Sequence, residues 1–230
     1  MGLGAIDYII HCDRRPSQVI VTGIDQKLID RAAALYTIED AANHGVELHY
    51  INSLNVSTPE LKALSPEGHG FDDVFVYAPV APLLEQADQL LGFDGCLNFF
   101  AGPTDPQFSA AFNFYNVHYA ATHVVGTSGG NTHDMIESLE LMASGRVNPS
   151  GLITHIGGLN AVINTTLNLP DIPGGKKLIY THFDFPLVAL TELANQPGEF
   201  YRELDRIVTA HQGLWSPEAE KFLLEHAPRL

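Results

Sequence analysis

Short apolar segments alternate with helical segments along the first 130 residues, and this alternation limits the possible folds more than any other feature. The strand-like segments span 18–25, 46–51, 72–77, 96–101 and 121–125. Between them, apolar residues recur at helical spacing, as in 28–36 and 82–91. This alternation is typical of a doubly wound parallel sheet. We therefore expect an α/β fold of the Rossmann type, followed by a C-terminal helical segment.

The first 25 residues have the pattern of the second half of a nucleotide-binding βαβ unit. Gly2 and Gly4 open an apolar helical run, and Asp25 closes the strand that follows. Asp25 comes about 20 residues after the glycines, the spacing at which an acid can meet a ribose hydroxyl. A complete unit needs a strand leading into three glycines, and Gly2 could serve only as the third. We therefore expect the first strand to be absent.

Loss of that strand has a structural consequence, because it is central in a sheet of order 3-2-1-4-5-6. The remaining strands should form two half-sheets, separated by about 10 Å or forced together with altered register. We also expect the chain to be part of a longer natural protein.

Small or turn-forming residues follow four of the expected strands, at 23–25, 78–80, 101–103 and 126–128. Doubly wound sheets bind ligands beyond the carboxyl ends of their strands. Small residues there would let the backbone approach a flat ligand closely. Tight turns between strands and helices also favour small residues, so a nucleotide crevice and a purely structural role are both open at this point.

Composition narrows the class of partner. The chain has 12 Lys and Arg against 27 Asp and Glu, a formal charge of -15, which argues against nucleic acid. Only Cys12 and Cys96 occur, which excludes a disulfide framework or a Cys-rich zinc site and fits a reducing cytoplasm. We find no signal peptide and no membrane span, and expect a cytoplasmic protein with a small-molecule or protein partner.

Histidines are the other candidate metal ligands in this sequence. Among His118, His123, His133 and His155, no pair of histidines has the i, i+4 helical spacing with a carboxylate that a zinc helix shows. We interpret these four as structural. Lys27 and Arg31 could meet a phosphate, but solvated helix charges are the more usual role for such residues.

Five long runs of the chain are unusually specific: FDDVFVY at 71–77, GCLNFFAGPTD at 95–105, FNFYNVHY at 112–119, THVVGTSGG at 122–130 and LNLPDIP at 167–173. They resemble the zinc-type medium-chain dehydrogenase/reductase (alcohol dehydrogenase) superfamily and, within it, the reductases of L-sorbose 1-phosphate. The resemblance covers nearly the whole chain. It implies three parts: a truncated nucleotide-binding domain at 1–129, a return segment at 130–181 that packs on a substrate domain, and a helical tail at 182–230.

The resemblance also implies hydride transfer from a nicotinamide cofactor, NADP or NAD, to the ketone of a sugar phosphate. The implied cofactor contacts are Gly2, Gly23, Ile24, Asp25, Ala78, Pro79, Val80, Ala101, Gly102, Thr127 and Ser128. The superfamily's zinc ligands and proton relay precede the nucleotide domain, so this chain is expected to hold no catalytic residues, no zinc ligands and no activity alone.

Two further implications concern the cofactor and assembly. The superfamily commonly has an acid where Gly23 stands, and its loss would leave room for a 2'-phosphate, as in NADP users. A homo-oligomer is expected from the same resemblance. The alternatives are a non-catalytic nucleotide-binding or oligomerisation module, or another zinc-type alcohol or polyol dehydrogenase.

Overall fold

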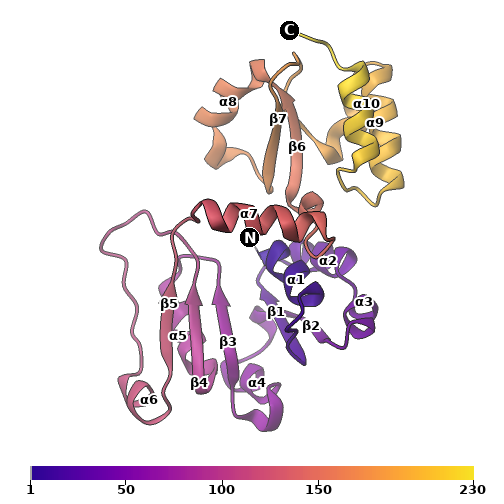
Figure 1. Cartoon of the computed structure of the whole chain (residues 1–230). Coiled ribbons are helices and arrows are strands. Elements are labelled where there is room, and N and C mark those ends of the chain that lie inside the picture. The colour runs from indigo at the N-terminus through magenta and orange to yellow at the C-terminus, as the bar shows by residue number, and fades with distance from the viewer. Residues whose placement is uncertain (1) are drawn as a thin grey trace. The chain divides into compact units, whose positions relative to one another are not determined.

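The computed structural model describes residues 2–230, which form two compact units, Met1–Arg146 and Val147–Leu230. Each unit is an α/β structure with its own sheets and core, and the elements of both are labelled in Figure 1. The boundary between the units follows α7, so the three-part division at 130 and 181 stays a prediction.

The first sheet of the N-terminal unit has two parallel strands, β1 (Gln18–Gly23) and β2 (Glu47–Asn52), paired in register from Gln18↔Glu47 to Gly23↔Asn52. The helices around it are α1 (Gly2–His11), α2 (Gln26–Leu35) and α3 (Ile38–Asn43). A shared core joins α1, α3 and β2 and contains Ile6, Ile10, Ala41, Val46 and Leu48. The apolar face of α1 anticipated from its spacing is therefore buried against this sheet.

The second sheet of this unit has three parallel strands in the order β3-β4-β5. They are β3 (Phe71–Val76), β4 (Leu91–Phe99) and β5 (His123–Gly126). The helices of this part are α4 (Thr58–Ala63), α5 (Ala81–Leu90), α6 (Phe114–Tyr119) and α7 (Thr132–Ala143), with 3-10 turns η1 (Ser53–Asn55) and η2 (Pro66–Gly68). Its core is Val76, Ala87, Leu91 and Leu97.

The expected α/β fold with parallel strands is confirmed. Among the described residues, the pair β1-β2 and the triplet β3-β4-β5 are separate sheets. These are the two half-sheets expected of a 3-2-1-4-5-6 sheet that lacks its central strand, since strands 2 and 3 stay paired and strands 4 to 6 stay together.

The C-terminal unit is built on a sheet of order β7-β6-β8. Here β6 (Ile153–Gly158) is parallel to β7 (Lys176–Tyr180) and antiparallel to β8 (Val188–Ala189). The other elements are η3 (Pro149–Leu152), η4 (Leu159–Ala161), α8 (Val162–Leu167), η5 (Leu169–Asp171), η6 (Leu190–Asn195), α9 (Glu199–Ala210) and α10 (Pro217–His226). In Figure 1, α9 and α10 lie together on the side of this sheet away from α8.

The structure corrects one part of the helical tail expected at 182–230. Residues 187–194 form β8 and η6 in place of an α-helix. Val188 pairs with Ile156 across the sheet, and Leu193 is fully buried in the same core as Leu204 and Leu223. Strand pairing and burial outweigh helix formation here, because an isolated helix of about eight residues is only marginally stable. The helices expected farther on, α9 and α10, are present.

Candidate cofactor site

Strand β1 ends at the first predicted contact. Gly23 is its last residue and is half-buried, while Ile24 and Asp25 follow it on the surface. A Cβ added to Gly23 would lie 3.3 Å from Cγ1 of Ile29, so this glycine lets α2 pack close to the end of the strand. A larger side chain at this position would have to move Ile29.

Asp25 has a structural role at the same place. It is the N-cap of α2, and its Oδ1 accepts hydrogen bonds from the backbone N–H of Lys27 at 2.9 Å and of Leu28 at 3.4 Å. These bonds satisfy helix-terminal donors, which is the usual function of an N-cap aspartate. Its ribose contact stays a prediction.

Two residues at this edge were not anticipated. Ser53 donates from its hydroxyl to the carbonyl of Gly23 at 3.2 Å, and the Asn52 amide donates to Gln26 at 3.1 Å. Both directly follow the strand expected at 46–51, and that position was the available signal. They add polar groups to the end of the β1-β2 sheet.

The ends of β3 and β4 hold the second group of predicted residues. Ala78 is half-buried and Pro79 and Val80 are exposed between β3 and α5, while Ala101 and the exposed Gly102 follow β4. Because Val76 pairs with Phe99, these two connections leave the sheet side by side. The β3-β4 pairing therefore brings the predicted residues 78–80 and 101–102 to one edge.

Two aromatic rings at this edge were also missed by sequence reasoning. The rings of Tyr77 and Phe100 are 5.9 Å apart, and burial raises the pKa of the Tyr77 phenol. Each directly precedes a predicted small residue. A Cβ added to Gly2 would lie 4.0 Å from Cδ2 of Tyr77, so the start of α1 lies at the carboxyl end of β3.

Strand β5 ends in the same row. Phe99 pairs with Gly126, and the exposed Thr127 and Ser128 follow. The hydroxyl of Thr127 is 3.5 Å from the carbonyl of Gly129, at the limit of a hydrogen bond. The carboxyl ends of β3, β4 and β5 thus bring together residues 78–80, 101–102 and 127–128. Residues 23–25 belong to the separate β1-β2 sheet.

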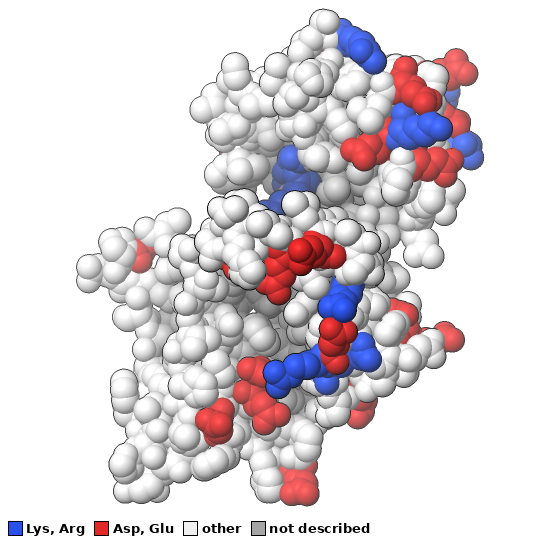
Figure 2. Space-filling model, viewed as in Figure 1, with Lys and Arg blue, Asp and Glu red and all other residues white. Residues whose placement is uncertain are grey.

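The chemistry of these edges suits a dinucleotide. They present backbone groups, hydroxyls, aromatic faces and one carboxylate at the ends of parallel strands, where open α/β sheets bind nucleotides. Catalytic zinc requires His, Cys or acidic ligands converging on one point, and the predicted contact residues do not fit that requirement. On the face drawn in Figure 2, acidic and basic side chains are interspersed rather than forming a basic stripe.

The four histidines interpreted as structural lie on separate elements. His118 is on α6, His123 on β5 and His133 on α7. His155 is buried on β6, where its Nδ1 lies 2.9 Å from the Thr154 hydroxyl. Burial, and secondly the charge of Lys177, lowers the His155 pKa below its usual value.

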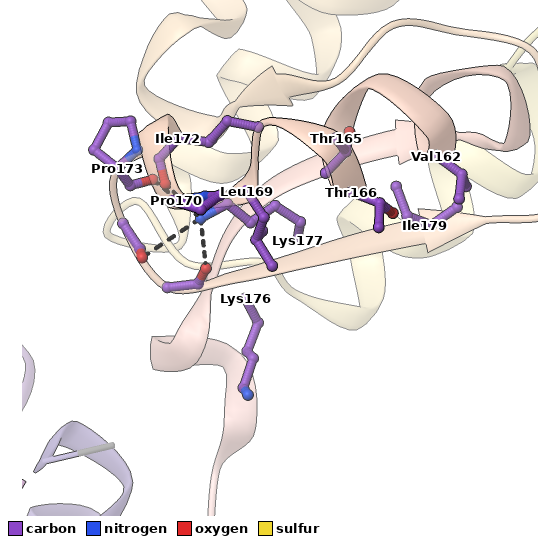
Figure 3. A pocket seen from close by; sticks show the side chains of 12 residues that line it. Val162, Thr165, Thr166, Leu169, Pro170, Ile172, Pro173, Lys176, Lys177 and Ile179 are labelled. Atoms are coloured by element: carbon purple, nitrogen blue, oxygen red, sulfur yellow. Dashed lines mark hydrogen bonds between the residues drawn. The ribbon is translucent and has the colours of Figure 1, made fainter. Parts of the chain in front are cut away.

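The C-terminal unit contains a cavity of about 680 Å³ between α8, the 169–175 turn and β7 (Figure 3). Lys177 does not offer its ammonium group to this cavity, because Nζ donates to the carbonyls of Ile172 at 3.1 Å and Gly175 at 2.9 Å. The Thr165 hydroxyl donates to the Ala161 carbonyl at 2.7 Å. The Lys177 ammonium and the Thr165 hydroxyl therefore stabilise the turn and the helix.

No helix of the described residues is long and apolar enough to cross a membrane. No family model matches the sequence. The chain is 54% identical over 229 residues to mannitol-1-phosphate 5-dehydrogenase of Aliivibrio fischeri, covering 98% of this chain and 54% of that protein. It is 49% identical over 227 residues to L-sorbose 1-phosphate reductase of Klebsiella pneumoniae, covering 99% of this chain and 53% of that protein.

Solved structures show the same fold at low sequence identity. An alcohol dehydrogenase zinc-binding domain protein from Burkholderia ambifaria matches with a TM-score of 0.59 at 17% identity, over 77% of this chain and 45% of that chain. An alcohol dehydrogenase from E. coli, solved with NADH, matches with a TM-score of 0.54 at 15% identity, over 77% of this chain and 48% of that chain. The chain spans about half the length of the curated relatives it matches. Its α/β fold resembles part of these solved dehydrogenase structures.

Proposed function

We propose that this chain binds a nicotinamide dinucleotide and forms the cofactor-binding part of an NAD(P)-dependent oxidoreductase. The observation that carries the proposal is the shared carboxyl edge of β3, β4 and β5, where residues 78–80, 101–102 and 127–128 come together. The start of α1 lies at the same edge, against Tyr77. When bound, the cofactor would supply the hydride, and the residues of this edge would bind and orient it.

Cofactor preference is proposed to depend on Gly23. A glycine there places no carboxylate beside the ribose, and Asp25 already caps α2. We therefore expect this chain to bind NADPH more tightly than NADH.

Titration with NADH and NADPH, followed by reduced-nicotinamide fluorescence, tests the proposal. Saturable binding of NADPH is expected. Gly23→Asp should weaken NADPH relative to NADH about fivefold, since two unit charges about 4 Å apart in water repel by about 1 kcal/mol. Ser17→Asp is the matched control, because Ser17 is exposed just before β1, at the opposite end of the strand from Gly23.

If neither NADH nor NADPH binds, the proposal that this chain binds a nicotinamide dinucleotide is refuted. An unchanged NADPH to NADH ratio in Gly23→Asp, or an equal change in Ser17→Asp, would remove Gly23 from the explanation of preference.

The substrate is proposed to be a ketose phosphate or the corresponding polyol phosphate. The names of the two curated relatives, mannitol-1-phosphate 5-dehydrogenase and L-sorbose 1-phosphate reductase, support this class. A protein that contains this chain together with a substrate domain should oxidise mannitol 1-phosphate or reduce L-sorbose 1-phosphate. The 230-residue chain alone should bind cofactor without turnover, and steady turnover by it would contradict this assignment.

A second candidate function is self-association in the cytoplasm, without catalysis. Apolar side chains are exposed on α7, where Met135, Ile136 and Leu139 are at least half exposed. Light scattering after size-exclusion chromatography tests it. Oligomers that Ile136→Glu dissociates would support this function, and a monomer at all concentrations would exclude it.

A further inference from the structure

Two helices of the N-terminal unit end in the same pair of residue types. Asp7 and His11 lie four residues apart in the last turns of α1, and Asp40 and His44 lie four residues apart at the end of α3. This spacing places each carboxylate beside its imidazole on one helix face. Ile10 of α1 and Ala41 of α3 are buried in one core, and the two pairs meet at its rim. The imidazole rings of His11 and His44 are 4.8 Å apart and nearly perpendicular.

The potential ligand atoms converge on Asp40. Nε2 of His11 lies 3.6 Å from Oδ2 of Asp40, and Nδ1 of His44 lies 3.7 Å from Oδ1. One ligand atom from each of the three residues falls within 4.8 Å of the others. Nitrogen and oxygen atoms bound to one tetrahedral zinc at about 2 Å are about 3.3 Å apart. Nδ1 of His44 also lies 2.9 Å from the Asp40 backbone carbonyl. Zinc binding through this nitrogen therefore requires loss of its proton to solvent and rotation of the ring away from that carbonyl, which brings the three atoms into one coordination shell.

Asp7 orients the first of these ligands. Nδ1 of His11 lies 2.8 Å from the Asp7 carbonyl and 3.1 Å from its carboxylate, which is 4% exposed. This contact directs Nε2, the other ring nitrogen, toward Asp40. A carboxylate behind a histidine is the usual arrangement that fixes the ring and tautomer of a metal-binding imidazole.

The electrostatic setting favours a cation. The C-terminal ends of α1 and α3 meet here, and each helix end carries partial negative charge. Two carboxylates add to it, while the nearby Arg15 uses Nη1 to donate to the Cys12 carbonyl at 2.8 Å. The cluster also lies away from the proposed cofactor edge, because His11 and His44 precede the amino ends of β1 and β2.

We propose that His11, Asp40 and His44 bind a divalent transition-metal ion, with zinc as the preferred cation, and that Asp7 is the positioning residue for His11. Borderline-soft nitrogen ligands with one carboxylate suit zinc and leave a fourth position for water. The ion links the end of α1 to the end of α3 and so stabilises the β1-β2 half of the unit. This site is independent of the proposed cofactor function.

Zinc titration of the 230-residue chain by calorimetry tests the site. One zinc ion per chain is expected, together with a higher unfolding temperature. His44→Gln and Asp40→Asn should each weaken zinc binding by roughly tenfold or more, and Asp7→Asn by about 10- to 100-fold. His49→Gln is the matched control, since His49 also pairs with an acid, Glu47, at 2.8 Å but lies outside the cluster.

The side chains of His44 and Asp40 are 36% and 47% exposed, so their variants should keep the fold, which circular dichroism checks. Replacing zinc with Co²⁺ should give visible absorption bands that are lost in His44→Gln and kept in His49→Gln. NADPH titration of His44→Gln separates this proposal from the proposed function, because cofactor binding should not change. Absence of zinc binding, or equal binding by wild type, His44→Gln and His49→Gln, would overturn the proposal.

Discussion

Replacement of Tyr180 by Phe should destabilise the C-terminal unit, because it leaves the buried indole N–H of Trp215 without its hydrogen-bond acceptor. The Trp215 indole Nε1 donates to the Tyr180 hydroxyl at 2.9 Å, and this hydroxyl donates to the Glu220 carboxylate at 2.8 Å. Trp215 is only 5% exposed. Tyr180→Phe removes the acceptor of a buried N–H, and an unsatisfied buried donor costs about 1–3 kcal/mol.

Two other variants serve as controls for the size of this stability loss. Tyr201 is a half-buried tyrosine of the same core, and its hydroxyl has no hydrogen bond among the described residues. Tyr201→Phe should therefore change the free energy of unfolding by less than about 0.5 kcal/mol. Glu220→Gln keeps an acceptor for the Tyr180 hydroxyl, and because Glu220 is exposed we expect a loss of about 0–1 kcal/mol.

Urea unfolding followed by tryptophan fluorescence is the appropriate assay. The chain has one Trp, so the signal reports the C-terminal unit directly. A shift of the unfolding midpoint at unchanged slope would measure the loss of stability. Equal midpoints for Tyr180→Phe and Tyr201→Phe would refute the argument, since the two variants remove the same atom and differ in the donor left behind.

Three further changes follow from burial. Leu204→Ala empties a fully buried site and should cost about 2–5 kcal/mol in urea unfolding, against less than about 1 kcal/mol for the 43% exposed Leu224→Ala. Gly70→Ala would place Cβ 2.6 Å from the Leu91 backbone at positive φ, so its melting temperature should fall further than that of Gly45→Ala, which has positive φ but open space. His155→Gln should flatten the loss of stability that occurs as the pH falls below 6.5.

The sign of the His155 effect follows from its environment. Burial, and secondly Lys177, lowers its pKa below 6.5, so the folded state binds the proton less readily than the unfolded state. Its stability contribution is complete above pH 6.5 and is lost as the pH falls through that value toward the lowered pKa. Equal pH dependence of stability in wild type and His155→Gln would contradict this reasoning. Equal losses of unfolding free energy in Leu204→Ala and Leu224→Ala, or equal melting temperatures for Gly70→Ala and Gly45→Ala, would contradict the two arguments from burial.

Local pattern predicted most of the secondary structure of the N-terminal unit. Apolar runs bounded by turn residues became β1 to β5, because short runs rich in β-branched and aromatic residues between turn signals favour strands. The division of these strands into two parallel sheets was predictable too, since strands 2 and 3 and strands 4 to 6 of a 3-2-1-4-5-6 sheet pair independently of each other. The segment 187–194 was not, because its choice between helix and strand depends on pairing with Ile156.

Some features of the candidate site were likewise predictable from the sequence, and others were not. Small residues after strands predicted the positions 78–80, 101–102 and 127–128, and register then placed them on one edge. The N-cap role of Asp25 could be seen only from the geometry of α2. Ser53 and the ring pair at Tyr77 were found only from the structure, because their roles depend on neighbours distant in sequence.

The sequence by itself determined the α/β class, the parallel half-sheets and the acidic surface charge, because periodicity and composition are properties of adjacent residues. The tertiary structure decided which residues meet. The cluster of His11, Asp40 and His44 joins residues about 30 positions apart, and no local pattern shows that α1 and α3 end at the same point. Packing of apolar faces brings the helix ends together, and the polar groups on those ends then acquire a chemistry that neither helix has alone.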